Sequence, residues 1–291
     1  MSQSLSLHAA AKINLTLDIL GTREDGYHLM QMVMQSVSLY DTVTLTLNDV
    51  PGIRLLCDRP DVPCDGRNIA WKAAERFYKA IEKEPAVTIS IDKVIPSEAG
   101  LAGGSADGAA VLVGLNRLHG DPLTTEQLCA IGLTIGADLP FCIVGGTQLT
   151  EGIGEKLTPL PALPDGWIVI AKPSEGVATG PCFKRFDAIP TEQVLHPATD
   201  KMLKALEQQD FAAVASHMGN VLEAAADCPG VERMRAVMEA HHPHGCCMTG
   251  SGSAVIAAFT DKAAAEACLK DVQKIARGFL VQPVPCGVKI I

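Results

Sequence analysis

Apolar and polar residues alternate along several short stretches of the chain, the period of a strand with one buried face. In residues 41–49, valine and leucine alternate with threonine. Residues 9–20 are rich in β-branched and apolar side chains, and residues 86–96 alternate again. These three stretches predict strands.

Elsewhere apolar residues recur every three or four positions, which is the spacing of an amphipathic helix. Residues 68–83 have this pattern, and so do residues 109–118 before Gly120. A third helix is predicted from Thr124, which stands three positions before a glutamine as in a capping box, to Gly136.

The second half of the chain begins after a proline-rich passage at residues 157–166. A buried strand at 167–173 follows, and helices are predicted at 198–209, 231–242 and 262–276. A strand at 253–259 and a last strand complete the pattern. We predict a mixed α and β chain of two lobes, residues 1–160 and 161–291.

Composition narrows the class of protein. The chain has 291 residues, 47% of them apolar and only 4% aromatic, so its core must be mainly aliphatic. It has 24 basic and 33 acidic side chains, a net charge of −9 without a basic tract. This balance disfavours non-specific nucleic-acid binding, and any anionic ligand must be held by local backbone N–H groups and a few cations.

The 10 cysteines are scattered and form no C-x-x-C pair, which indicates reduced thiols. The N-terminal residues lack a signal-peptide pattern, and no apolar run reaches about 20 residues. We therefore expect a cytoplasmic protein that contacts no membrane, as a monomer or homodimer.

The most unusual stretch is the glycine-rich segment "IPSEAGLAGGSADGAAVLVGLN", residues 95–116. It has no lysine in the Walker position, and its glycines do not have dinucleotide-fold spacing. Glycine permits close backbone approach, and a helix beginning near Ser105 would direct free N–H groups at an anion. A simple glycine turn with Ser105 as N-cap is the alternative. Asp107 would cap, point aside or meet a metal, because it would repel a phosphate.

Three separated segments resemble the motifs of the kinase superfamily of galactokinase, homoserine kinase, mevalonate kinase and phosphomevalonate kinase, the GHMP kinases. The first begins with "AAAKINLTLDILGTREDGYH", the second is the glycine loop, and the third is "CMTGSGSAVIAAF" at residues 247–259. The resemblance implies an α+β fold of two lobes, each with a mixed sheet covered on one face by helices. ATP and the acceptor would bind in the cleft between the lobes.

Two segments narrow the resemblance. "AKINLTLDILGTREDGYH" and "GADLPFCIVGGTQLTEGIGE" are similar to segments of the 4-diphosphocytidyl-2-C-methylerythritol kinase family. This implies ATP- and Mg²⁺-dependent phosphorylation of the 2-hydroxyl of a cytidine-diphosphate-linked polyol, giving ADP, in non-mevalonate isoprenoid biosynthesis. Another acceptor, such as mevalonate, homoserine or a sugar, and a catalytically silent nucleotide sensor are the alternatives.

The resemblance also implies roles for individual residues. It places Asp138 as the base and Lys12 as the cation beside it and the acceptor oxygen. On their own, these residues would be interpreted as a turn aspartate and a solvated lysine. The implied nucleotide-binding residues are Pro96, Ser97, Glu98, Ala99, Gly100, Leu101, Ala102, Gly103, Gly104, Ser105 and Ala106. The implied substrate-binding residues are Asn14, Tyr27, His28, Thr179, Phe183, Gly250, Ser251 and Gly252.

Some positions depart from the family pattern or lie outside it. Ser97 and Glu98 replace small or apolar residues, and Ser253 stands where many relatives have proline. The "HHPHGCC" run at residues 241–247 fits no zinc spacing. We interpret that run as a helix end and a loop leading into a buried strand.

Overall fold

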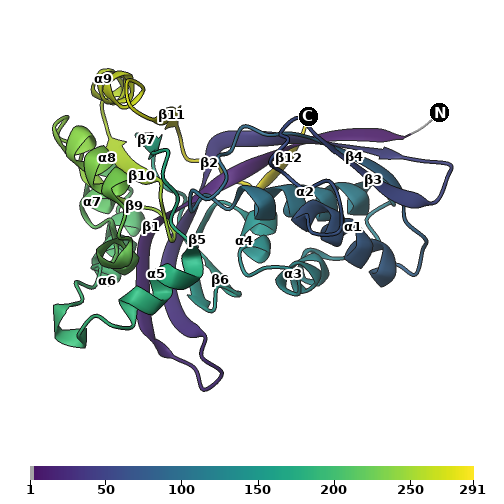
Figure 1. Ribbon diagram of the computed structural model, residues 1–291, viewed down its shortest axis with the longest axis horizontal. Helices are drawn as coiled ribbons and strands as arrows, with labels where there is room; N and C mark the ends of the chain where they lie inside the picture. Colours follow the sequence, from purple (N-terminus) through teal and green to yellow (C-terminus); the bar gives the residue numbers. More distant parts are fainter. Residues whose placement is uncertain (1–2) are drawn as a thin grey trace.

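Two long strands organise the molecule, of which the computed structural model describes residues 3–291. Strand β1 (Ser4–Thr22) and strand β2 (His28–Leu47) pair antiparallel along most of their length. Figure 1 shows this hairpin running between the two lobes, with its turn projecting from the edge of the molecule. Both strands carry long buried apolar runs, because helices or neighbouring segments cover them.

The first sheet is built around this hairpin in the order β12-β1-β2-β4-β3, with β5 beside β2, β6 beside β5 and β8 beside β1. Its other strands are β3 (Gly52–Cys57), β4 (Ala86–Asp92), β5 (Thr147–Gly152), β6 (Lys156–Pro159), β8 (Gly219–Asn220) and β12 (Val288–Ile290). The pairs β1–β8 and β3–β4 are parallel and the others are antiparallel. The sheet is mixed, as predicted.

Four helices of the first lobe gather on one side of this sheet (Figure 1). They are α1 (Ile69–Ala80), α2 (Gly103–Leu118), α3 (Thr125–Leu133) and α4 (Leu139–Val144). Helix α2 lies directly on the hairpin because small residues face it. A Cβ at Gly114 would come within 2.6 Å of Leu45 and 2.8 Å of Leu7. The predicted capping box at Thr124 is present at the start of α3.

The second lobe contains a four-stranded sheet in the order β11-β7-β10-β9. Its strands are β7 (Trp167–Lys172), β9 (Gly245–Met248), β10 (Val255–Phe259) and β11 (Arg277–Val281). All of its pairs are antiparallel, so the mixed sheet predicted for this lobe is wrong in that detail. The helical segments are α5 (Thr179–Phe186), η1 (Thr191–Gln193), α6 (Thr199–Glu207), α7 (Phe211–Ser216), η2 (Val221–Ala225), α8 (Pro229–Glu239) and α9 (Lys262–Val272).

The helices and strands expected from periodicity are confirmed, and the differences concern extent and short elements. Strand β2 begins at His28, well before the alternating stretch that predicted it. Strands β3, β5, β6 and β8, one of the two strands after α9, and helices α4, α5 and α7 were not predicted. The boundary at residue 160 stays a prediction. Within residues 3–291, no helix has the length and apolar content needed to cross a membrane.

Candidate active site

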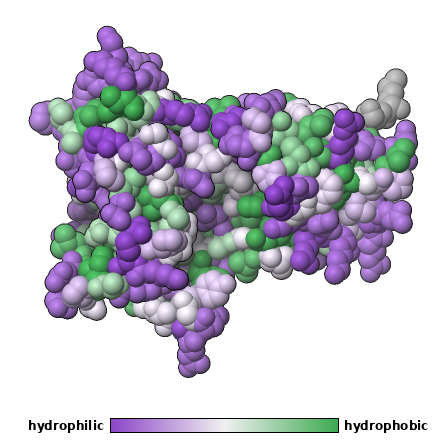
Figure 2. Space-filling model, in the orientation of Figure 1, coloured by the Kyte–Doolittle hydropathy of each residue, from purple (hydrophilic) through white to green (hydrophobic). Residues whose placement is uncertain are grey.

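A cavity of about 570 Å³ lies where the two lobes meet, and Figure 2 shows the surface hollowed between them. Its walls come from the hairpin, the glycine loop, the start of α4, the start of α5 and the loop before β10. The predicted site residues that line it are Lys12, Pro96, Ser97, Glu98, Ala99, Gly100, Leu101, Ala102, Gly103, Gly104, Ser105, Asp138, Thr179, Phe183, Gly250, Ser251 and Gly252. The fold therefore gathers the three sequence motifs around one space.

The glycine loop lies between β4 and α2 and presents backbone to this cavity. Helix α2 begins at Gly103, and its first intrahelical bond runs from Ala106 N–H to Ala102 O at 2.9 Å. Ala102 is the N-cap, in a left-handed conformation and without a side-chain cap. The helix thus starts two residues earlier than predicted, and Ser105 as N-cap is wrong. The first N–H groups of α2 have no intrahelical acceptor and are suited to bind an anion.

The third motif packs against the glycine loop through backbone alone. Gly100 has a φ of +72°, and a Cβ there would lie 2.1 Å from the carbonyl oxygen of Thr249. On the opposite side of the contact, a Cβ at Gly250 would lie 2.9 Å from the Gly100 Cα. Ala254 N–H also donates to Ala99 O at 3.2 Å. These contacts require glycine on both sides, so the two motifs form one packed unit.

Lys12 and Asp138 line the same cavity, on β1 and at the start of α4. Lys12 is 5% exposed, and its Nζ donates to Asn14 Oδ1 at 2.7 Å. Between residues 3 and 291 no ion pair within 4.0 Å joins Lys12 to Asp138, so the two side chains line the same cavity without a salt bridge. Asp138 is half-buried and its side chain caps no helix N–H, which leaves its carboxylate available to a ligand.

Asn14 is buried beneath the cavity and does not line it. Its Nδ2 lies 3.2 Å from Met32 Sδ, and its backbone N–H donates to Thr249 Oγ1 at 2.8 Å. Asn14 was expected to look into the acceptor site, but it is not part of the cavity wall. Asn14 holds Lys12 in place and ties β1 to the third motif.

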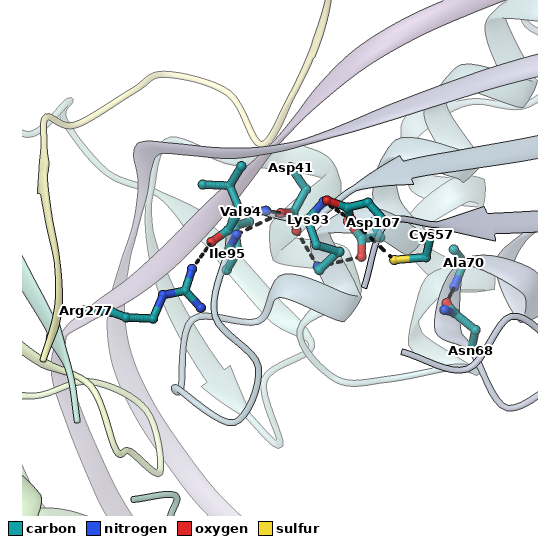
Figure 3. A network of polar contacts seen from close by, with 10 residues as sticks. Asp41, Cys57, Asn68, Ala70, Lys93, Val94, Ile95, Asp107 and Arg277 are labelled. Carbon is teal, nitrogen blue, oxygen red and sulfur yellow. Dashed lines mark hydrogen bonds and ion pairs between the residues drawn. The ribbon is translucent and has the colours of Figure 1, made fainter. Parts of the chain in front are cut away.

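A buried cluster of three charged side chains lies beneath the glycine loop (Figure 3). Lys93 Nζ donates to Asp107 Oδ2 at 2.8 Å and also to Asp41 Oδ2. Asp41 Oδ1 accepts from the backbone N–H groups of Val94 at 2.6 Å and Ile95 at 2.8 Å. The cluster thus joins β2, the segment after β4, and α2.

The contacts of this cluster explain how the acidic residue Asp107 can lie near a candidate phosphate-binding loop. Asp107 points aside to Lys93 and is 3% exposed, with Oδ1 buried and without a partner among the described residues. Burial raises the pKa of Asp107 well above its usual range, and the Asp41 charge adds to the rise although Lys93 opposes it. Burial lowers the pKa of Lys93, but the two carboxylates outweigh it and raise that pKa.

Glu98, the other acidic residue of the loop, remains exposed at the cavity wall. It has a φ of +50°. A Cβ built at Gly176 would lie 2.9 Å from Glu98 Oε2, so the carboxylate projects toward the segment before α5. Water therefore continues to solvate this charge beside the loop.

The residues implied for cytidine lie at the other end of the cavity. Phe183 lines it from α5, and the His28 ring lies 4.8 Å from the Phe183 ring, tilted by 34°. His28 Nε2 is 2.7 Å from Asp187 Oδ1. Tyr27, in the hairpin turn, is 60% exposed, and neither it nor His28 forms part of the cavity wall. Thr179 and Ser251 hydroxyls are 2.8 Å apart and join α5 to the third motif.

Ala106, the last residue of the implied nucleotide set, is buried behind the loop. Lys93 and Asn14 have supporting positions that sequence reasoning did not assign, and Lys93 alone of these two also lines the cavity. Two features of the sequence could have indicated this role for Lys93. It is a charged residue at the junction of a strand and the glycine loop, and the helix that follows carries an acidic residue, Asp107, in its first turns.

The histidines and cysteines of residues 241–247 do not converge on a site. His241 pairs with Asp271 at 3.0 Å, and His244 lies 2.8 Å from Thr260 Oγ1. Burial raises the pKa of Cys246 to about 12. Over residues 3–291, no group of three or more His, Cys, Asp or Glu side chains is arranged to hold a metal ion. The segment leads from α8 into β9, as we interpreted it.

Comparison with known proteins identifies the family. The profile of the GHMP kinases N terminal domain matches residues 68–146, and that of the GHMP kinases C terminal domain matches residues 202–277. The 4-diphosphocytidyl-2-C-methyl-D-erythritol kinase of Carboxydothermus hydrogenoformans is 41% identical over 283 residues, covering 97% of each chain. That of Clostridium beijerinckii is 40% identical over 272 residues, covering 93% of this chain and 96% of the relative.

Solved structures agree with these sequence matches. A crystal structure of 4-(cytidine 5′-diphospho)-2C-methyl-D-erythritol kinase is 30% identical, with a TM-score of 0.80 over 96% of this chain and 99% of that chain. A homoserine kinase from Cytophaga hutchinsonii has the same TM-score of 0.80 at 20% identity, covering 100% of this chain and 98% of that one, which shows a shared fold. The chain therefore belongs to the GHMP kinases, as its three motifs predicted, and within them to the 4-diphosphocytidyl-2-C-methyl-D-erythritol kinase family, as the two narrower segment matches predicted.

Proposed function

We propose that this kinase transfers the γ-phosphoryl group of ATP to the 2-hydroxyl of 4-(cytidine 5′-diphospho)-2-C-methyl-D-erythritol, giving the 2-phosphate and ADP. The observation that carries the proposal is the position of Lys12, Asp138 and the glycine loop on one cavity. Phosphoryl transfer to an alcohol needs an anion cradle, a cation and a group that receives or orients the hydroxyl proton. The cavity contains all three.

In the proposed mechanism, the free N–H groups at the start of α2 bind the ATP phosphates. The acceptor oxygen attacks the γ-phosphorus in line, the bond from that phosphorus to the β–γ bridging oxygen breaks, and ADP leaves. Asp138 accepts the hydroxyl proton. Lys12, held by Asn14 at 2.7 Å, stabilises negative charge on the acceptor oxygen and the transferred group.

Mg²⁺ fits this cavity if the nucleotide supplies most of its ligands. Mg²⁺ usually keeps several waters and binds phosphates with one or two carboxylates. Glu98 and Asp138 line the cavity with carboxylates free to take that part, whereas the Asp107 carboxylate is bonded to Lys93. When bound, the ion would neutralise phosphate charge. We therefore exclude Asp107 from the candidate ligands and retain Glu98, because coordination would weaken Asp138 as the proton acceptor.

The test is ADP formation with the cytidine-linked polyol in Lys12→Ala and Asp138→Asn. We expect kcat to fall about 10²- to 10⁴-fold in each variant while ATP binding by calorimetry is retained. Lys201→Ala and Asp200→Asn are matched controls, because both residues lie at the start of α6 and outside the cavity. Turnover as in the wild type in both cavity variants would remove this mechanism.

The two alternatives have different signatures. Another acceptor is supported if mevalonate, homoserine or galactose gives a higher kcat/KM than the cytidine-linked polyol. A silent sensor is supported if both ligands bind and no ADP is released. The expected monomer or homodimer and the cytoplasmic location remain predictions, to be checked by light scattering and by fractionation of cells.

A further inference from the structure

The ring of His28 is held from two sides by one short helix. Phe183 lies on α5, and Asp187 is the residue that caps its C-terminus. Residues four positions apart project from the same side of a helix. The Phe183 ring lies 4.8 Å from the His28 ring, and the Asp187 carboxylate lies 2.7 Å from Nε2 at the ring edge.

We infer that Asp187 is a positioning residue that fixes the proton of His28 on Nε2, so that Nδ1 accepts a hydrogen bond from the exocyclic amine of the substrate's pyrimidine. The inference rests on the proposed function and deepens it, because it names the residue that would hold the substrate-contacting histidine in one tautomer. His28 would contact the substrate, and Asp187 would act through it.

The proton position follows from hydrogen-bond chemistry. An ionised carboxylate can only accept, so the nitrogen 2.7 Å from Asp187 Oδ1 must be the donor. In a neutral imidazole the other nitrogen then carries a lone pair. Within residues 3–291, the His28 ring forms this one hydrogen bond, and Nδ1 is left without a protein partner.

A free acceptor beside an aromatic face selects among pyrimidines. A base that stacks on Phe183, which lines the cavity, would bring its edge near His28. The 4-position of cytosine carries an amine, which donates to Nδ1. The same position of uracil carries a carbonyl, whose lone pairs would face that of Nδ1. An acceptor site left unpaired by the wrong ligand is a strong source of discrimination.

The chain contains a matched pair for comparison. His196 Nδ1 lies 2.7 Å from Asp18 Oδ1, the same separation as in the His28–Asp187 pair. Neither His196 nor Asp18 lines the cavity beside Phe183. Asp18 is buried and also accepts from Ile19 N–H, whereas the His196 side chain is 47% exposed. His196→Gln therefore removes a carboxylate–histidine contact from its exposed partner, outside the candidate base-binding end.

The first measurement is the His28 tautomer, by two-bond ¹H–¹⁵N correlation NMR of the full chain labelled at histidine, with His28→Gln for assignment. We expect a single Nε2–H tautomer above the histidine titration range. In Asp187→Ala a mixture should appear, and Asp187→Glu should restore the single form. An Nδ1–H tautomer in the wild type, or an unchanged spectrum in Asp187→Ala, overturns the inference.

The second measurement is selectivity, by calorimetric Kd values for CDP and UDP and by KM for the cytidine-linked polyol. Asp187→Ala should reduce the CDP preference and raise KM about five- to tenfold, leaving kcat within about twofold. His196→Gln should retain the wild-type preference. A wild type that binds UDP as tightly as CDP, or a preference unchanged by Asp187→Ala, overturns the inference.

These readouts separate the inference from the proposed function. If the wild type releases no ADP with the cytidine-linked polyol, the proposed function fails, while the tautomer and the Kd ratio still decide the role of Asp187. Asp187 has a side chain that is 53% exposed, so we expect Asp187→Ala to fold with little change in melting temperature.

Discussion

The two ends of the cavity are built by different physical means. At the glycine-loop end, backbone packs on backbone at Gly100 and Gly250, over a buried cluster of Lys93, Asp41 and Asp107. At the hairpin end, Tyr27 is exposed and Asp187 reaches His28 from the surface.

This difference predicts that one end of the cavity contributes mainly to the stability of the fold and the other mainly to substrate specificity. A buried charge or a backbone contact affects the folded state as a whole, because its removal leaves an unpaired charge or a steric clash. An exposed ion pair contributes little to stability, because water competes for both partners. We therefore expect changes at the loop end to alter unfolding and changes at the hairpin end to alter substrate binding.

The strongest test of this contrast is Lys93→Met. It leaves two buried carboxylates without their cation, and we expect a loss of about 3–5 kcal/mol in the free energy of unfolding, measured by urea denaturation. Asp187→Asn at the exposed pair should change that quantity by less than about 0.5 kcal/mol. Equal losses in the two variants would contradict the contrast.

Gly100→Ala should have the next largest effect. The new Cβ would lie 2.1 Å from the Thr249 carbonyl oxygen at a φ of +72°. We expect about 3 kcal/mol of destabilisation and weaker ATP binding by calorimetry. Gly180→Ala is the matched control, because a Cβ at Gly180 on α5 meets nothing within 4 Å. A stable Gly100→Ala chain with wild-type ATP affinity would show that the loop is free to move.

Asp107→Asn should have an effect that depends on pH. Because burial raises the pKa of Asp107, the folded chain keeps a proton that the unfolded chain loses above pH 3.8. Wild-type stability from this group is therefore full below that pH and falls as pH rises toward the raised pKa, by up to about 1.4 kcal/mol per pH unit.

The asparagine variant lacks this titration. Its stability relative to the wild type should improve as pH increases from about 4, as measured by urea denaturation across a pH series. A constant difference between the two proteins at all pH values would mean that Asp107 is already ionised in the folded chain.

The smallest expected stability change is that of Tyr27→Ala. The side chain is 60% exposed, so we expect less than about 0.5 kcal/mol in the free energy of unfolding. KM for the cytidine-linked polyol should nevertheless rise, because a stacking surface is lost. Steady-state kinetics test this, and an unchanged KM would remove Tyr27 from the substrate-binding set.

The helices and strands that were predicted have strong local sequence patterns. The predicted site residues likewise lie in contiguous sequence motifs. The capping box at Thr124 locates the start of α3, and the alternating stretch at 41–49 identifies the C-terminal part of β2. Lys12, Asp138 and the glycine loop were found because each belongs to a contiguous motif. Their arrangement around a single cavity agrees with the fold that those motifs implied.

What sequence reasoning missed depends on contacts distant along the chain. Lys93 is 52 positions from Asp41 and 14 from Asp107, so a local pattern could not assign its partners. The same holds for Asn14, whose backbone binds Thr249 across 235 positions. Strand β2 was extended by pairing with β1 and β5, and Asp187 gained a partner only when α5 met the hairpin.

The contact between Gly100 and Gly250 also constrains how the protein can vary. A side chain on either residue must displace the other segment, so drift at one position is limited by a position 150 residues away. Natural variants and engineered libraries should therefore retain both glycines together. Directed evolution toward a new phosphoryl acceptor would have more freedom in the hairpin turn and at the exposed positions of α5, where a changed side chain meets solvent.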